Sequence, residues 1–160
     1  MKKKLACFLV AMFVVTINNN LFAQNKELKV NEIPQDVKDV LDEYLKILSE
    51  AKTLDEAGLN IVKVCAGHLV NSSGVISSDI KPYSLKKDWE NVKFYKVPAV
   101  ITRCVYSPND YDGFQETLFE GDKYKIWIAK KDGTAGMPAP IPIIKPKTGK
   151  PKVISNIGSL

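Results

Sequence analysis

The sequence predicts an α+β fold in which N-terminal helices pack on one face of a curved antiparallel sheet. In the first half of the chain, apolar residues recur at helical spacing, and after residue 92 the period changes to the two-residue alternation of strands. Helices therefore come first and strands follow as a group, which is the order of α+β domains. The length of 160 residues and the 45% hydrophobic content fit one globular domain.

Residues 1–23 have the three regions of a secretory signal peptide. Three lysines follow Met1, an uncharged apolar run covers Leu5–Val15, and Leu21-Phe22-Ala23 precedes Gln24. The apolar run is shorter than the roughly 20 residues that a membrane-spanning helix needs. We therefore expect an exported protein, periplasmic or extracellular, without stable membrane insertion after the signal is removed.

The mature chain is expected to begin with a flexible linker, 24–33, because this stretch is polar. A single α+β domain is expected over 34–160. Its first helix is predicted at about 34–49, where Pro34 suits the first helical turn. The apolar residues of this helix form one continuous stripe: Val37, Val40, Leu41, Tyr44, Leu45 and Leu48.

Two further helices are predicted before the sheet. The second is expected at about 54–70, where Thr53 and Glu56 have the spacing of a capping box. A short third helix is expected at about 84–91, with Leu85 on its buried side.

The second half predicts strands that are joined by short turns. A hairpin turn is expected at Glu120-Gly121-Asp122, and further turns at Lys131-Asp132-Gly133 and Lys147-Thr148-Gly149. The expected strands are 97–107, 114–119, 123–130, 139–145 and 152–157.

This order of helix, helix, short helix and antiparallel meander resembles the nuclear-transport-factor-2-like superfamily, whose members are cystatin-like α+β cones. The resemblance covers about 34–157, and the stretch 151–157, Pro-Lys-Val-Ile-Ser-Asn-Ile, is similar to the last strand of that superfamily. The resemblance implies a cavity between the helices and the concave sheet. The superfamily includes isomerases, dehydratases, cyclases and binding domains without catalysis, so it does not fix the function.

Composition excludes several classes of site. The single histidine excludes zinc enzymes of the H-E-x-x-H type, and no Gly-rich phosphate loop is present, so we expect neither a metal nor a cofactor. Removing the leader leaves 20 basic against 18 acidic residues, and Arg103 is the only arginine. Because nucleic-acid recognition depends strongly on arginine, we expect no nucleic-acid partner.

Cys65 and Cys104 are the two cysteines of the mature chain, and both fall on apolar periodic faces. An exported protein permits a disulfide between them, since its compartment is oxidising. Free cysteines are also among the most buried residue types, so a pair of free core thiols is the other interpretation.

Four residues are candidates for the wall of a ligand cavity: His68, Tyr95, Tyr106 and Trp127. Aromatic side chains commonly line such cavities, although ordinary core packing explains most aromatics of a sheet. Cys65 and His68 are three residues apart on the predicted second helix, which would let a thiol and an imidazole meet. The plainer interpretation is a core cysteine and a histidine at the end of a helix. Glu116, in a predicted strand, is expected on a solvated face.

These features predict an exported, non-enzymatic domain that binds a small apolar ligand or a protein partner, a second copy of the chain included. The alternative is a small isomerase-, dehydratase- or cyclase-like enzyme that uses a cavity carboxylate or His68. A structural component of the cell envelope is a third class. A titratable group facing an open cavity would favour the enzyme, and a filled interior with an exposed apolar patch would favour an interaction protein.

The leader gives a first prediction. Protein recovered from an export-competent host should begin at or near Gln24, because all three regions of a signal peptide are present. Intact-mass analysis of the exported protein measures this, and a mass that retains residues 1–23 would contradict it.

Overall fold

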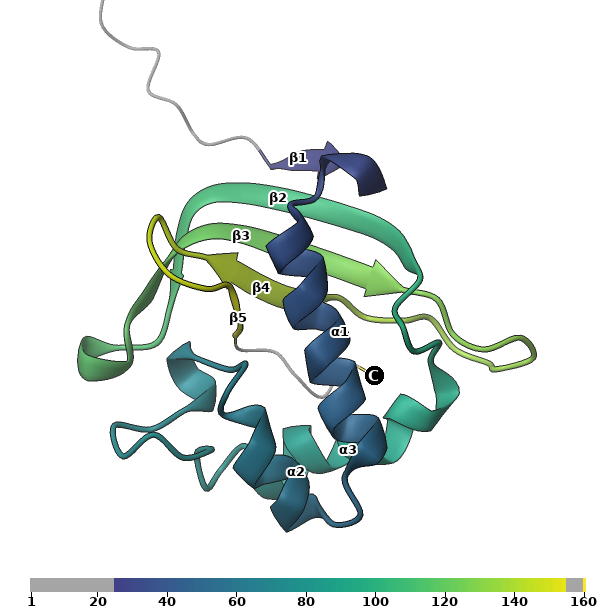
Figure 1. Cartoon of the computed structure of the whole chain (residues 1–160), viewed down its shortest axis with the longest axis horizontal. Helices are drawn as coiled ribbons and strands as arrows, with labels where there is room; N and C mark the ends of the chain where they lie inside the picture. Colours follow the sequence, from purple (N-terminus) through teal and green to yellow (C-terminus); the bar gives the residue numbers. More distant parts are fainter. Residues whose placement is uncertain (1–24, 155–159) are drawn as a thin grey trace, which may run out of the picture.

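A computed structural model describes residues 25–154 and 160. Its centre is a five-stranded antiparallel sheet in the order β1-β2-β3-β4-β5, so that strands adjacent in the chain are also adjacent in the sheet. Figure 1 shows the sheet arching over α1, with α2 and α3 farther from the strands. The α+β class predicted from the sequence is confirmed.

The helices and strands follow the predicted grouping, apart from a short first strand. Several single turns of 3-10 helix and one π-helical turn, Lys81–Leu85, join them, and the π-helical turn runs directly into α3. The elements are β1 (Lys26–Leu28), α1 (Gln35–Glu50), α2 (Leu54–Ile61), α3 (Lys86–Asn91), β2 (Ile101–Asp112), β3 (Phe119–Ile128), β4 (Ile141–Lys145) and β5 (Lys152–Val153).

Helix α1 packs into the curve of the sheet with the predicted apolar stripe. Its side chains at Leu41, Tyr44 and Leu45 have no exposed surface, and α1 contacts β4, β5 and α2. The opposing sheet face consists of alternate strand residues: Tyr124, Ile126 and Ile128 on β3, and Ile141 and Ile143 on β4. A void large enough for a water molecule would give the side chains around it some accessible surface. Leu41, Tyr44 and Leu45 have none, so the space between α1 and the sheet is filled at these three residues.

A buried carboxylate joins three parts of this core. The Asp88 side chain, on α3, accepts a hydrogen bond of 2.7 Å from the Tyr44 hydroxyl and one of 3.0 Å from the Leu160 main-chain N–H. Burial, and then the nearby carboxylate, raise the pKa of the Tyr44 hydroxyl, so Tyr44 stays neutral and donates. On the same helix, the Trp89 indole N–H donates to the carbonyl of Ala51 at the end of α1.

The expected linker, 24–33, is instead structured over its described part. Lys26–Leu28 form β1, which pairs with β2 so that Leu28 lies opposite Cys104, and Ile33 is buried. Only one apolar side chain of β1 turns toward the core, which is too little alternation to be recognised in the sequence.

The second helix is much shorter than predicted. It begins as expected, because the Thr53 hydroxyl accepts a hydrogen bond from the Glu56 N–H, but it ends at Ile61 rather than near residue 70. Beyond it, the chain pairs with the sheet edge: the Val153 N–H donates to Val64, and the Ala66 N–H donates to Val153. Pairing with β5 therefore overrides the helical pattern of this segment.

The β2–β3 connection also differs from the predicted hairpin. Strand β2 continues to Asp112, a 3-10 turn at Gln115–Thr117 replaces the predicted strand 114–119, and Glu120-Gly121-Asp122 lies inside β3. A Cβ at Gly121 would lie 2.2 Å from the carbonyl oxygen of Lys145, so here glycine permits close approach of β4 rather than a turn. The predicted signal peptide, 1–23, and the end of the predicted last strand lie outside the described residues.

The packing of α1 gives a stability prediction. Leu45→Ala should lower the free energy of unfolding by about 2–5 kcal/mol, because it removes a fully buried side chain from the helix–sheet core. The matched control is Lys46→Ala, one residue along on the exposed side of α1, which should change it by less than about 0.5 kcal/mol. Denaturant unfolding of both variants measures this. Equal midpoints would mean that α1 does not pack on the sheet.

Candidate functional site

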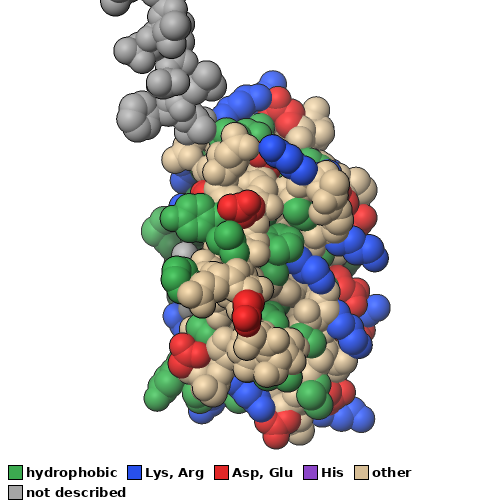
Figure 2. All heavy atoms as spheres, turned by 90° about the vertical axis from the view of Figure 1, so that its left-hand side faces the viewer, with side chains coloured by type: hydrophobic (Ala, Val, Ile, Leu, Met, Phe, Trp, Pro, Cys, Tyr) green, Lys and Arg blue, Asp and Glu red, His purple; other side chains and the backbone are tan. Residues whose placement is uncertain are grey.

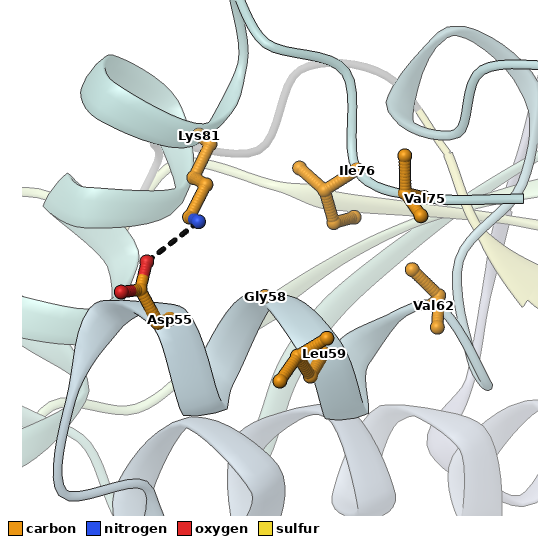
Figure 3. A pocket seen from close by; sticks show the side chains of 7 residues that line it. All are labelled: Asp55, Gly58, Leu59, Val62, Val75, Ile76 and Lys81. Carbon is orange, nitrogen blue, oxygen red and sulfur yellow. Dashed lines mark ion pairs between the residues drawn. The ribbon is translucent and has the colours of Figure 1, made fainter. Parts of the chain in front are cut away.

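A surface groove of about 450 Å³ lies between α2 and the segment that follows it (Figure 3). Most of its wall is aliphatic, and one ion pair lies at its rim, with Asp55 Oδ1 2.6 Å from Lys81 Nζ. Its lining residues are Asp55, Gly58, Leu59, Val62, Val75, Ile76 and Lys81. We call this feature the α2 groove.

Each wall of the α2 groove is held by local structure. Leu59 on α2 and Val62, the residue that follows the helix, line the groove, and Gly58 lies between them and the ion pair. The opposite wall is fixed by Asn71, whose N–H donates to the Val75 carbonyl and whose side chain accepts from the Val75 N–H. The groove is therefore formed by ordered backbone on both sides.

The side chains of the α2 groove are unusually exposed for apolar residues. Leu59 is 72% exposed and Val75 49% exposed, whereas Ile76 behind Val75 is buried. Tyr83, on the π-helical turn that carries Lys81, is 75% exposed. Figure 2 shows hydrophobic side chains spread over the face of the molecule that lies at the left in Figure 1. Exposed apolar groups that gather around a groove are typical of interaction sites.

A second chemical feature joins His68 to the end of β2. The Asp112 carboxylate, which is 7% exposed, accepts a 2.9 Å hydrogen bond from the His68 N–H and lies 3.1 Å from His68 Nδ1. The Gly113 N–H is 3.2 Å from the same ring nitrogen. Nδ1 can either donate to Asp112 or accept from the Gly113 N–H, depending on the tautomer. In the tautomer that donates to Asp112, Nε2 is the acceptor. The imidazole itself is 61% exposed.

Two glycines allow this pairing. Gly67 has φ of +64°, and a Cβ there would lie 2.0 Å from Asp112 Oδ2. Gly113 has φ of +88°, and its Cβ would lie 2.2 Å from the Thr117 carbonyl oxygen. Both positions need the left-handed backbone and the absence of a side chain.

The structure does not bring the four predicted cavity residues together. His68 pairs with Asp112 at one end of β2, and Trp127 lies on the sheet face that points away from the helices. Tyr106 packs on Tyr124 with ring centroids 5.4 Å apart, on the inner face. Tyr95 is buried beside Lys130 and borders a separate, polar hollow. The prediction failed because the two-residue period of a strand does not reveal which face of the sheet is concave.

Cys65 and Cys104 are both buried, as expected, and both are free thiols in the structure. Burial raises the pKa of Cys104 to about 11 and raises that of Cys65 well above its usual range, so neither is a thiolate at neutral pH. Cys65 lies beyond the end of α2 and forms an isolated parallel β-bridge with Val153. It therefore does not share a helical face with His68. The thiol–imidazole pair considered from the sequence is therefore not formed.

Other candidate chemistry is absent from the part of the chain that the structure describes. No group of three or more His, Cys, Asp or Glu side chains there could hold a metal ion. Among the same residues, no helix has the length and apolar character to cross a membrane. Glu116 is exposed on the 3-10 turn, in agreement with the expected solvated position.

Sequence reasoning did not identify the α2 groove or Asp112. For the groove, two signals existed: Gly58 within a helix, and Leu59 away from the apolar stripe of that helix. Asp112 gave no signal, because its partner lies 44 residues earlier in the chain.

No family model, curated protein or solved structure matches this chain.

Gly67, which lies against the Asp112 carboxylate, gives a stability prediction. Gly67→Ala should lower the free energy of unfolding by about 2–4 kcal/mol, because it places an alanine in the left-handed conformation and adds a steric clash with Asp112. Gly74→Ala is the matched control: Gly74 has φ of +73° but open space around its Cβ, so the cost should be about 1–2 kcal/mol. Thermal unfolding of both variants compares them. Equal costs would show that Asp112 does not closely approach Gly67.

Proposed function

We propose that this chain is an exported protein-interaction domain whose α2 groove receives an apolar side chain of a partner protein. The observation that carries the proposal is the exposed aliphatic wall of an ordered groove, with Leu59 72% and Val75 49% exposed. Exposed apolar surface costs free energy in water, and a bound apolar group recovers it.

The packing of the interior supports a protein partner over an enclosed small ligand. The core side chains between α1 and the sheet are fully buried, which leaves no void beside them for an enclosed ligand. The α2 groove is open on one side, as suits a side chain that projects from another protein. Burying a Leu-sized group contributes about 1.5–3 kcal/mol to the free energy of binding. This is too little for a stable complex, so the partner must also contact neighbouring surface.

The rim of the groove adds directional contacts. The Asp55 side chain is 82% exposed and Lys81 38% exposed, so their ion pair presents an acceptor and a donor to solvent. A partner main chain that crosses the rim finds both kinds of polar group within a few ångströms of the aliphatic wall. This combination of an apolar centre and a polar edge matches the anatomy of protein interfaces.

An enzyme that uses His68 is the second candidate, and the Asp112–His68 pair is the observation that favours it. A buried carboxylate that orients an imidazole is the arrangement of a general base. Among the described residues, however, no hydroxyl or thiol contacts Nε2, and Cys65 does not reach it as a helical neighbour. The pair therefore supports the enzyme less strongly than the groove supports binding.

The groove proposal predicts a selective loss of binding. Peptides selected against the mature protein from a displayed library should carry a Leu, Met or Phe anchor. Leu59→Lys should raise the Kd of these peptides by about tenfold or more. The matched control is Phe114→Lys, which also replaces an apolar residue about 70% exposed, but on the β2–β3 turn. Kd values from fluorescence anisotropy should be unchanged by that control.

Three results would count against the proposal. Equal losses in both variants would mean that the peptides bind exposed apolar groups in general. Selected peptides that bind Leu59→Lys as tightly as the unaltered protein would place the interaction elsewhere. Saturable binding of a small apolar compound that Leu59→Lys abolishes, with no peptide enriched, would assign the groove to a small ligand instead.

A further inference from the structure

The outer face of the sheet carries an arginine that is held against a tryptophan. Since Tyr124, Ile126 and Ile128 point to the core, Trp127 between them points away from the helices. Arg103 on β2 lies opposite Trp127 in the strand register, and its Cζ is 4.8 Å from the centre of the indole ring. A cation–π contact of this kind favours conformations that keep the guanidinium over the ring.

The donor groups of Arg103 are only partly used. Glu27, on β1, contacts the Nε edge through Oε1 at 3.4 Å, and the arginine side chain remains 52% exposed. Within the part of the chain that the structure describes, Nη1 and Nη2 donate no hydrogen bond. The end of the guanidinium therefore keeps two parallel donors for a carboxylate, which it can bind bidentately.

A second cation lies on the same face. Lys125 is two residues before Trp127 on β3, lies opposite Val105, and forms no ion pair with any described residue. Its neighbour Lys123 is already paired with Asp110 at 2.5 Å. Arg103 and Lys125 thus leave this part of the sheet with positive charge that the neighbouring carboxylates do not fully compensate.

We propose that Arg103, Lys125 and Trp127 bind an extended acidic segment of a partner protein. The guanidinium of Arg103 lies over Trp127, which is two residues from Lys125 on β3. Outward residues on one strand repeat every two positions, roughly 6.6–6.8 Å, and an extended peptide places alternate side chains at the same repeat. A segment with acidic residues at alternate positions can therefore set one carboxylate on the Arg103 fork and the next near Lys125. The exposed part of the indole packs against the aliphatic part of the segment.

This site is separate from the α2 groove and does not depend on its proposed function. The groove belongs to the helices, which lie on the inner side of the sheet (Figure 1). Strand alternation places Arg103 and Trp127 on the outer face. Both surfaces can be occupied at once, so the domain can join two partners. Because Arg103 is exposed, binding should weaken as salt concentration rises.

The test uses a labelled octapeptide of alternating Thr and Glu, with a Thr and Gln peptide of the same length as the uncharged comparison. Fluorescence anisotropy with the mature protein should give saturable binding of the Glu peptide alone. Arg103→Lys keeps the charge but removes the fork, and should weaken binding about fivefold or more. Trp127→Leu, which frees the guanidinium, should do the same.

Lys93→Gln is the matched control, because Lys93 is also exposed and also lies over an aromatic ring, at 5.1 Å from Phe94, but outside the sheet. It should change the Kd by less than about twofold. Unchanged binding in Arg103→Lys, or an equal loss in Lys93→Gln, would overturn the proposal. Tighter binding of oligogalacturonate than of the Glu peptide would also overturn it, in favour of an acidic glycan. Arg103→Lys leaves the ring in place, so it remains informative should Trp127→Leu not fold.

Discussion

The packing of α1 into the curve of the antiparallel sheet is the constraint on which the rest of the structure depends. A helix with one fully apolar stripe must cover it, and the inner side chains of β3 and β4 are the surface that does so. Once they are in contact, Tyr44 lies beside Asp88, and α3 and Leu160 are tied to the same carboxylate. Burial of that polar group is tolerated because it is hydrogen-bonded.

The side chains between α1 and the sheet that have no exposed surface leave no water-sized void beside them. The two surfaces proposed for binding both lie on the outside of the described part of the fold. The α2 groove lies on the helical side, where α2 ends early and the following segment turns back to form its second wall. The Arg103–Trp127 stack lies on the opposite side of the sheet, where strand alternation places every second residue of β2 and β3.

The early end of α2 links the fold to both the groove and the His68–Asp112 pair. Because 64–66 pairs with β5, the chain reaches Gly67 at the edge of the sheet rather than at the end of a helix. His68 then meets Asp112, and the chain continues through Asn71 to Val75, the outer wall of the groove. One departure from helical geometry thus positions two otherwise unrelated features.

The sequence by itself determined the α+β class, the bounds of α1 within a residue or two, its buried stripe, the Thr53 cap and the burial of Cys65 and Cys104. These follow from local spacing and polarity, which act over a few residues. The tertiary structure alone decided that Leu28 and Val64 join the sheet, that Trp127 points outward, and that His68 meets Asp112. Each of these depends on contacts between residues far apart in the chain. The free energy of such contacts exceeds the few tenths of a kcal/mol to about 1 kcal/mol by which local preferences differ.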